Sequence, residues 1–159
     1  MKQTIGISDY RISDAPEDEL ITYSLGSCIG LSLYDRTRKI GGLIHCMLPL
    51  SRIDPERARA KPAMFTDTGI MRLIEELLEK GAERRRLIAR AAGAARLLEN
   101  QGAFRIGDRN QVVLRKILWK NNILLESEDV GGTCARTMSL RISDGVTSIR
   151  SAGNRYDLT

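Results

Sequence analysis

Apolar residues recur at helical spacing in the middle of the chain. They fall at i, i+3, i+4, i+7 and i+8 and form one stripe: Ile70, Leu73, Ile74, Leu77 and Leu78. We expect Thr66 or Asp67 to cap the start of this helix. Gly81 is expected to follow its end, because glycine readily adopts the left-handed conformation found after many helices.

A second stripe predicts another helix further along the chain: Val113, Leu114, Ile117 and Leu118. Asp108 or Asn110 is expected to cap its start. The helix is expected to continue up to Asn121-Asn122.

Alternating or short apolar runs predict strands in much of the remaining sequence. The alternating positions are Ile29, Leu31 and Leu33, and then Met138, Leu140 and Ile142. Residues 87–89 and 123–125 read as short buried strands. Asp144-Gly145 before Val146 indicates a two-residue hairpin turn.

Strands outnumber helices in this pattern, and many of their connections look like hairpins. The chain is therefore predicted to belong to the α+β class. We expect a single-domain layered α/β sandwich over residues 1–159, with largely antiparallel sheets and two main helices packed on them.

The composition indicates the cellular compartment of the protein and limits the kinds of binding partner. Aromatic residues make up only 4% of the chain, so the core should be aliphatic. The sequence has no apolar run of the roughly 20 residues that cross a bilayer, and its start lacks a secretory signal. We therefore expect a cytoplasmic protein without membrane insertion. The net charge of +5 is compatible with an acidic partner or nucleic acid, and a solvated basic surface is the simpler interpretation.

The cysteines do not form a recognisable framework. Cys28, Cys46 and Cys134 are odd in number and show no C-x-x-C spacing. A disulfide scaffold and a zinc site are both poorly supported by this pattern, and no metal is expected.

Cys28 and the single histidine, His45, suggest a thiol hydrolase. A thiol becomes a strong nucleophile once a base takes its proton. The segments 28–34 and 40–47 read as two strands around a polar turn. If the hairpin is centred between Arg36 and Thr37, Cys28 and His45 lie directly opposite, with Cβ atoms about 4.5–5.5 Å apart.

A one-residue slip of that register would place Ile44 or Cys46 opposite Cys28 instead. Cys46 follows His45 directly and should point to the other face, into the core. A strand cysteine is also often only a packing residue, which is the structural alternative for Cys28.

Glycines beside the cysteine favour catalysis, because they let backbone N–H groups approach an oxyanion. Gly26 and Ser27 are therefore candidate oxyanion or substrate-binding positions, together with the N–H of Cys28. Thr22, on the strand before the cysteine turn, is a candidate to orient the imidazole. Asp35 and Ser24 are rivals for that role.

Several blocks in the right order resemble the chemoreceptor glutamine deamidases of the CheD family. They are Leu25-Gly26-Ser27-Cys28, Gly41-Gly42, His45-Cys46-Met47-Leu48-Pro49, Ile106-Gly107-Asp108-Arg109-Asn110, and Asp129-Val130-Gly131-Gly132 followed by Ala135-Arg136. The similarity spans nearly the whole chain.

The resemblance implies hydrolysis of glutamine side-chain amides to glutamate on bacterial chemoreceptors, and of glutamate methyl esters in some members. It places the catalytic cysteine, histidine and threonine at Cys28, His45 and Thr22, without metal or cofactor. It implies a fold like the catalytic domain of the cytotoxic necrotizing factor deamidases. The partners would be chemoreceptor cytoplasmic helices and, in several bacteria, a CheC-type phosphatase.

Two other functional classes remain open. A non-catalytic adaptor would hold a CheC-type phosphatase or a receptor without chemistry at Cys28. A nucleic-acid-binding protein is less favoured, because the charge is modest and aromatics are few.

Overall fold

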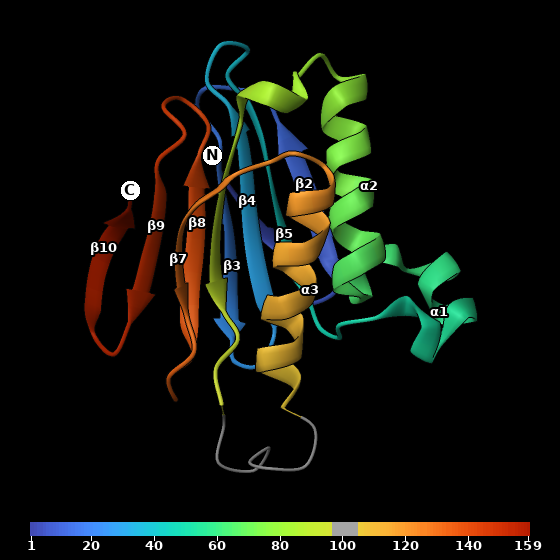
Figure 1. Ribbon diagram of the computed structural model, residues 1–159. Helices are drawn as coiled ribbons and strands as arrows, with labels where there is room; N and C mark the ends of the chain where they lie inside the picture. Colours follow the sequence, from blue (N-terminus) through green and yellow to red (C-terminus); the bar gives the residue numbers. More distant parts are fainter. Residues whose placement is uncertain (97–104) are drawn as a thin grey trace.

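Two five-stranded sheets and a helical layer build the fold, as the computed structural model of residues 1–96 and 105–159 shows (Figure 1). In the first sheet the spatial order is β1 (Lys2–Ile5), β3 (Glu19–Leu25), β8 (Arg136–Arg141), β9 (Thr147–Ser151) and β10 (Asn154–Leu158). In the second it is β2 (Asp9–Ser13), β5 (Ile40–Cys46), β4 (Ile29–Asp35), β6 (Leu87–Gly93) and β7 (Leu125–Val130). Only the β1–β3 and β6–β7 pairs are parallel among the pairs described, which confirms the largely antiparallel α+β prediction.

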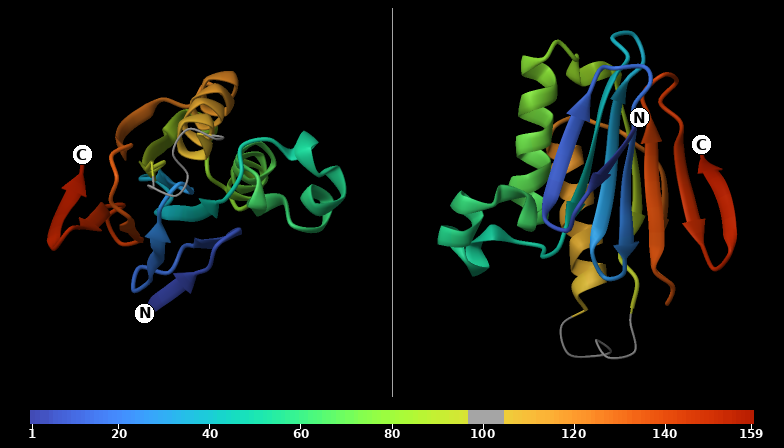
Figure 2. Two further views of the ribbon diagram at one scale, coloured as in Figure 1. Left: turned by 90° about the horizontal axis from the view of Figure 1, so that it is seen from below. Right: turned by 180° about the vertical axis from the view of Figure 1, so that it is seen from behind.

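Two long helices, α2 (Thr66–Glu79) and α3 (Ile106–Lys120), cover one face of the second sheet, and the first sheet covers the other (Figures 1 and 2). The short helix α1 (Pro55–Ala60) lies to one side of them. Single 3₁₀ turns cover Ser51–Ile53, Pro62–Met64 and Arg84–Arg86. Within the described residues, no helix is long and apolar enough to cross a membrane.

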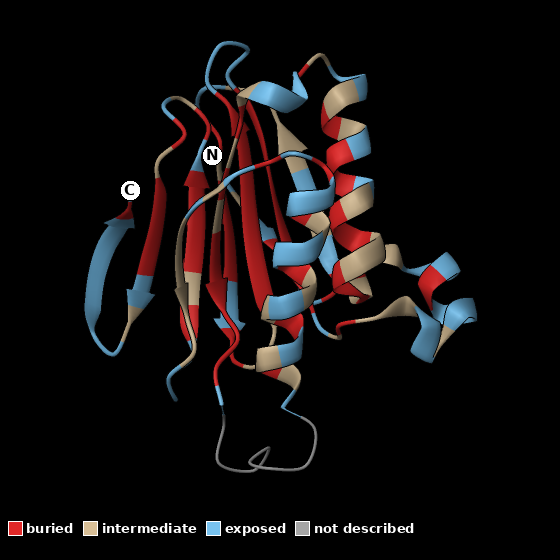
Figure 3. Cartoon of the chain, in the orientation of Figure 1, coloured by how far each residue is buried: buried red, intermediate tan, exposed pale blue. Residues whose placement is uncertain are grey.

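The second sheet separates two apolar cores because its side chains alternate between faces. Along β4, Ile29, Leu31 and Leu33 pack against the helices, whereas Tyr34 packs toward the first sheet. The central strands β4 and β5 are accordingly buried along their whole length (Figure 3). Both stripes predicted for the helices reach the helical core: Ile70, Leu73, Ile74 and Leu77 of α2, and Leu114 and Leu118 of α3.

The cap predictions for both helices are wrong. Phe65 occupies the position before α2, because the Asp67 carboxylate accepts hydrogen bonds from Ser51 instead. The helix α3 begins at Ile106, earlier than expected. Asp108 there pairs with Arg96 at 2.7 Å, and Asn110 is buried inside the protein.

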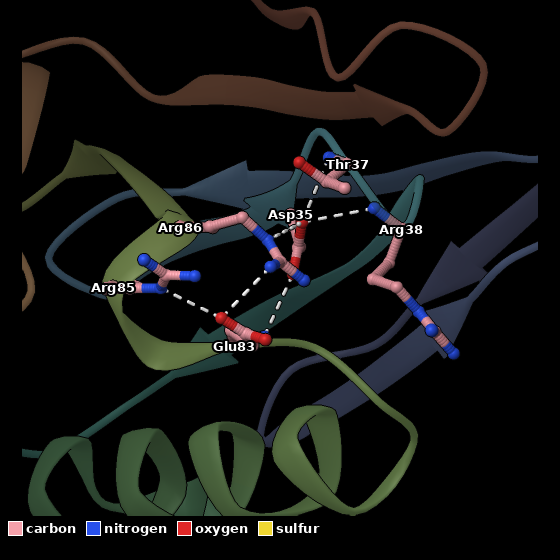
Figure 4. Close-up of polar contacts among 6 residues, drawn as sticks. All are labelled: Asp35, Thr37, Arg38, Glu83, Arg85 and Arg86. Atoms are coloured by element: carbon pink, nitrogen blue, oxygen red, sulfur yellow. Dashed lines mark hydrogen bonds and ion pairs between the residues drawn. The ribbon is translucent and has the colours of Figure 1, made fainter.

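The β4–β5 hairpin is shifted by two residues from the predicted register. Its ladder pairs Asp35 with Ile40 and Gly30 with His45, so Cys28 is not directly opposite His45. The reason is the Asp35 side chain. Its Oδ1 accepts hydrogen bonds from the N–H groups of Thr37 and Arg38, which centres the turn one residue later in the chain than predicted (Figure 4). A shift of two preserves the face, and Cys28 still packs toward the core between the sheets.

Asp35 also ties this hairpin to the segment before β6. Its buried carboxylate accepts a hydrogen bond from the N–H of Glu83 at 2.9 Å and pairs with Arg86 at 3.0 Å (Figure 4). Burial by itself raises the pKa of Asp35, but the Arg86 contact and these backbone donors outweigh it and hold the pKa below its usual value.

Two of the predicted strand segments need smaller corrections. Of residues 123–125, only Leu125 belongs to β7, and Ile123 is a buried residue before it. The hairpin at Asp144-Gly145 is present between β8 and β9, but its loop is longer than two residues. Gly145, at φ +75°, lies so close to the Tyr34 ring that a Cβ would meet it at 2.2 Å.

Candidate active site

Cys28 lies on the connection that carries the chain from the first sheet to the second. This loop joins the end of β3 at Leu25 to the start of β4 at Ile29. The Cys28 carbonyl accepts a hydrogen bond from the N–H of Ala94 at 2.8 Å. Gly93 approaches that carbonyl so closely that a Cβ would lie 2.4 Å from it, so only glycine fits there. The cysteine therefore lies on a firmly held loop, with its side chain half-buried.

Asn110 fastens this loop to the end of the histidine strand. Its Nδ2 donates to the carbonyls of Ser27 at 3.0 Å and Met47 at 3.2 Å, and its Oδ1 accepts from Thr66. Both carbonyls can only accept, which fixes the orientation of the amide. A single buried side chain from α3 thus holds the elements that carry Cys28 and His45 at a set separation.

His45 meets Thr22 across the space between the two sheets. Nδ1 of His45 lies 2.7 Å from Thr22 Oγ1, and both side chains are fully buried. The same hydroxyl donates its one proton to the carbonyl of Ile5 at 2.8 Å. It must therefore accept from His45, which places the ring proton on Nδ1 and leaves the lone pair on Nε2.

Nε2 of His45 is correspondingly available. It is buried and has no hydrogen-bond partner among the described residues. Burial lowers the pKa of His45 to about 4, so the ring is neutral at pH 7 and Nε2 can take a proton. This is the protonation state that a general base requires.

Cys28 is a thiol at rest in this environment. Burial raises its pKa, and a contact with its own backbone N–H offsets this only in part. A thiolate therefore has to form by proton transfer during a reaction rather than stand preformed. Cys46 lies in the helical core as expected, and burial raises its pKa further still.

The other predicted positions are the candidate oxyanion donors and the candidates to orient the imidazole. The N–H of Gly26 already donates to the carbonyl of Ser24 at 3.0 Å, so it is engaged in the turn. The N–H groups of Ser27 and Cys28 have no backbone acceptor among the described residues. Asp35 lies at the opposite end of the hairpin, and Ser24 is exposed, so Thr22 alone of the three rivals contacts the imidazole.

Asn110 and Arg136 support the Cys28 loop, a structural role that the sequence analysis did not assign to them. The buried Arg136 donates to the carbonyls of Gly93 at 3.0 Å and Gly131 at 2.8 Å, which supports the segment against Cys28. Both residues stand in the motif blocks quoted above, but nothing in the sequence indicated which carbonyls they reach. Among residues 1–96 and 105–159, no group of three His, Cys, Asp or Glu side chains is placed to hold a metal.

Comparison with known proteins assigns the chain to a family. Residues 47–151 match the family model described as CheD chemotactic sensory transduction. The chain therefore belongs to the CheD family.

Its relatives share nearly the full length. A probable chemoreceptor glutamine deamidase CheD from Solibacter usitatus is 53% identical over 97% of this chain and 91% of that protein. One from Syntrophus aciditrophicus is 44% identical, with 94% of this chain and 93% of that protein covered. A partial likeness to the Bacillus licheniformis protein YfiH has a TM-score of 0.47 and 15% identity over 77% of this chain and 49% of that one, which is too low to support an argument.

Proposed function

We propose that this protein hydrolyses the side-chain amides of particular glutamines on bacterial chemoreceptors to glutamate, with Cys28 as nucleophile. The relatives named above are called chemoreceptor glutamine deamidases, which supports this activity. The observation that carries the assignment of residues is the contact between Thr22 Oγ1 and His45 Nδ1. It leaves a basic nitrogen, without a partner among the described residues, on the same side of the sheet as a half-buried thiol.

The first half of the reaction forms a thioester. His45 Nε2 takes the proton of Cys28, and the sulfur attacks the carbonyl carbon of the glutamine side chain. The resulting imidazolium donates its Nε2 proton to the amide nitrogen, and ammonia leaves as the C–N bond breaks. Thr22 accepts from Nδ1 throughout, so it holds the ring and stabilises its transient charge.

The second half releases the product with water. His45 takes a proton from a water molecule, the hydroxide attacks the thioester carbon, and the C–S bond breaks to give glutamate. The proton then returns to the sulfur. Both tetrahedral intermediates carry an oxyanion, for which the N–H groups of Ser27 and Cys28 are the proposed donors. One such donor contributes about 3–4 kcal/mol to transition-state stabilisation. The N–H of Gly26 serves the turn instead.

A glutamate methyl ester can follow the same route, with methanol in place of ammonia. The substrates would be the cytoplasmic helices of chemoreceptors, so we place the protein in the cytoplasm. A CheC-type phosphatase is a second proposed partner.

Site-resolved mass spectrometry of a chemoreceptor cytoplasmic fragment tests the function. Incubation with the protein is expected to convert specific glutamines to glutamate and to release an equal amount of ammonia. A fragment whose modified glutamines are replaced by asparagine serves as the control and should release none. Stable binding of the fragment without conversion would instead identify a non-catalytic adaptor, which is the alternative function.

A further inference from the structure

The exposed face of α3 carries positive charge in a regular stripe. Arg109, Val112, Lys116 and Lys120 follow one another at steps of three, four and four residues, so they share one face of the helix, and Arg105 directly precedes the helix. All five are exposed, and this side of α3 is open to solvent in Figure 3. Four cations thus lie in line around one apolar residue.

The stripe forms one wall of a groove of about 760 Å³, which we call the α3 groove. Pro49, Leu50 and Arg52 line the other side, and Val113 and Ile117 contribute apolar surface. A second hollow of about 630 Å³ between α1 and α2 adjoins it through Arg52 and Ile117. Neither hollow contains an aromatic side chain among its lining residues.

The cations of the α3 groove have no acidic partners within the described residues. None of Arg52, Arg105, Arg109, Lys116 and Lys120 takes part in an ion pair there. Of the two carboxylates that line the groove, Asp108 pairs with Arg96, and Asp67 accepts hydrogen bonds from Ser51 and keeps its charge. Arg115, on a neighbouring face of α3, is paired with Glu128. Among the described residues the groove lining therefore has five cations without an ion pair against one unpaired carboxylate, a positive excess.

Like charges one turn apart repel each other, so this face is poorly arranged for an isolated protein and well arranged for an acidic partner. The apolar residues between the cations indicate that the partner is also apolar. An amphipathic helix supplies both features from one face, and it fits a groove that runs along a helix. Single-stranded nucleic acid is less suited, because the groove lining offers no aromatic side chain on which its bases could stack.

We infer that the α3 groove docks an acidic amphipathic helix of a protein partner. Its apolar side chains pack on Val112, Val113 and Ile117, and its carboxylates pair with the cations on either side.

Fluorescence anisotropy of a labelled peptide tests the inference without reference to catalysis. The probe is a synthetic helix of about four turns, with a strip of leucines that is flanked on both sides by glutamates. Wild-type protein is expected to bind it. The double variant R109E/K116E is expected to bind it at least 10-fold more weakly, and to bind a lysine version of the same peptide more tightly than wild type does.

The matched control is R150E/R155E, which makes the same charge change at exposed residues paired across β9 and β10, far from α3 (Figure 1). It should bind the glutamate peptide within about twofold of wild type, apart from the general effect of net charge. Circular dichroism of both variants checks that they are folded. Equal loss of binding in the two variants would overturn the inference. So would failure of the wild type to bind the peptide, or R109E-sensitive binding to duplex DNA or anionic vesicles alone.

Discussion

The hydroxyl of Thr22 has only one proton, and that proton is committed to the Ile5 carbonyl. Everything proposed for His45 follows from this, because an acceptor at Nδ1 selects the tautomer with a free Nε2. In the proposed mechanism a neutral hydroxyl takes the role that a carboxylate plays in other triads. It would keep the orientation of the ring, whereas it would stabilise the charge of the imidazolium less.

Replacing Thr22 with valine tests this role at the residue scale. Thr22→Val keeps the shape but removes the acceptor, so kcat should fall about 100-fold with little change in KM. Thr22→Ser keeps the hydroxyl and is expected to retain most of the activity. Steady-state kinetics of ammonia release measure both. Equal activity of the valine variant and the wild type would contradict the assignment.

The buried ring of His45 also predicts a pH dependence of stability. Its pKa is about 4 in the folded protein, against 6.5 for an unperturbed histidine. Between these values the unfolded chain binds the extra proton, so stability is full above pH 6.5 and falls as the pH drops toward 4. The loss should reach about 3 kcal/mol, as measured by urea unfolding at several pH values.

His45→Asn is the control for that experiment, because its amide can still donate to Thr22 but does not titrate. The chain has no other histidine, so the variant should lack the slope between pH 6.5 and 4. A similar slope in wild type and variant would assign the effect to other groups.

At the scale of elements, the site depends on contacts between segments that are distant in sequence. Asn110 of α3 joins the Cys28 loop to the segment that follows β5. The helical core holds α3 in place, and Asn110 transmits that position to the loop.

Asn110→Ala should therefore uncouple the cysteine from the histidine. The partly buried carbonyls of Ser27 and Met47 lose their donor and Thr66 loses its acceptor, which should cost about 2 kcal/mol of stability. At temperatures where the variant is folded, kcat should fall about 10-fold or more while KM changes little. Thr66→Ser, which keeps the hydroxyl on the other side of the amide, is the matched control and should behave like wild type. Unchanged kcat in folded Asn110→Ala would show that the clamp is dispensable.

The hairpin that carries His45 is anchored at its far end by the Asp35–Arg86 pair. Arg86→Ala leaves the fully buried Asp35 without its cation and should destabilise the protein by about 3 kcal/mol. Arg85→Ala removes a neighbouring, largely exposed ion pair with Glu83 and should change stability by about 0.5 kcal/mol or less. Urea unfolding of the two variants compares them directly. Equal destabilisation would show that burial of the pair is unimportant.

At the scale of the whole molecule, apolar periodicity predicted the α+β class, the largely antiparallel strands and both long helices. It did not predict caps or register. Those depend on single side chains such as Asp35 and Asp67, which bond to segments they do not adjoin in sequence. The polarity of the turn residues does not show which backbone N–H groups will donate hydrogen bonds to an aspartate, so it cannot fix the centre of the hairpin.

In the candidate site, too, some residues were proposed from the local sequence, whereas one role depends on the tertiary structure. Cys28 and His45 were proposed because a thiol and a unique histidine are chemically distinctive, and Thr22 because of its place on the preceding strand. Asn110 was read only as a helix cap. Its function as a clamp depends on the packing of α3 against the sheet, which no local pattern contains.

The most direct test of the proposed mechanism is the rate of glutamine-to-glutamate conversion in a chemoreceptor fragment, followed by mass spectrometry for three variants. Cys28→Ala and His45→Asn are each expected to lose about 1,000-fold or more of the wild-type rate. Cys134→Ala, which removes an exposed thiol, should match the wild type. Wild-type conversion at the same glutamines by folded Cys28→Ala would contradict the account.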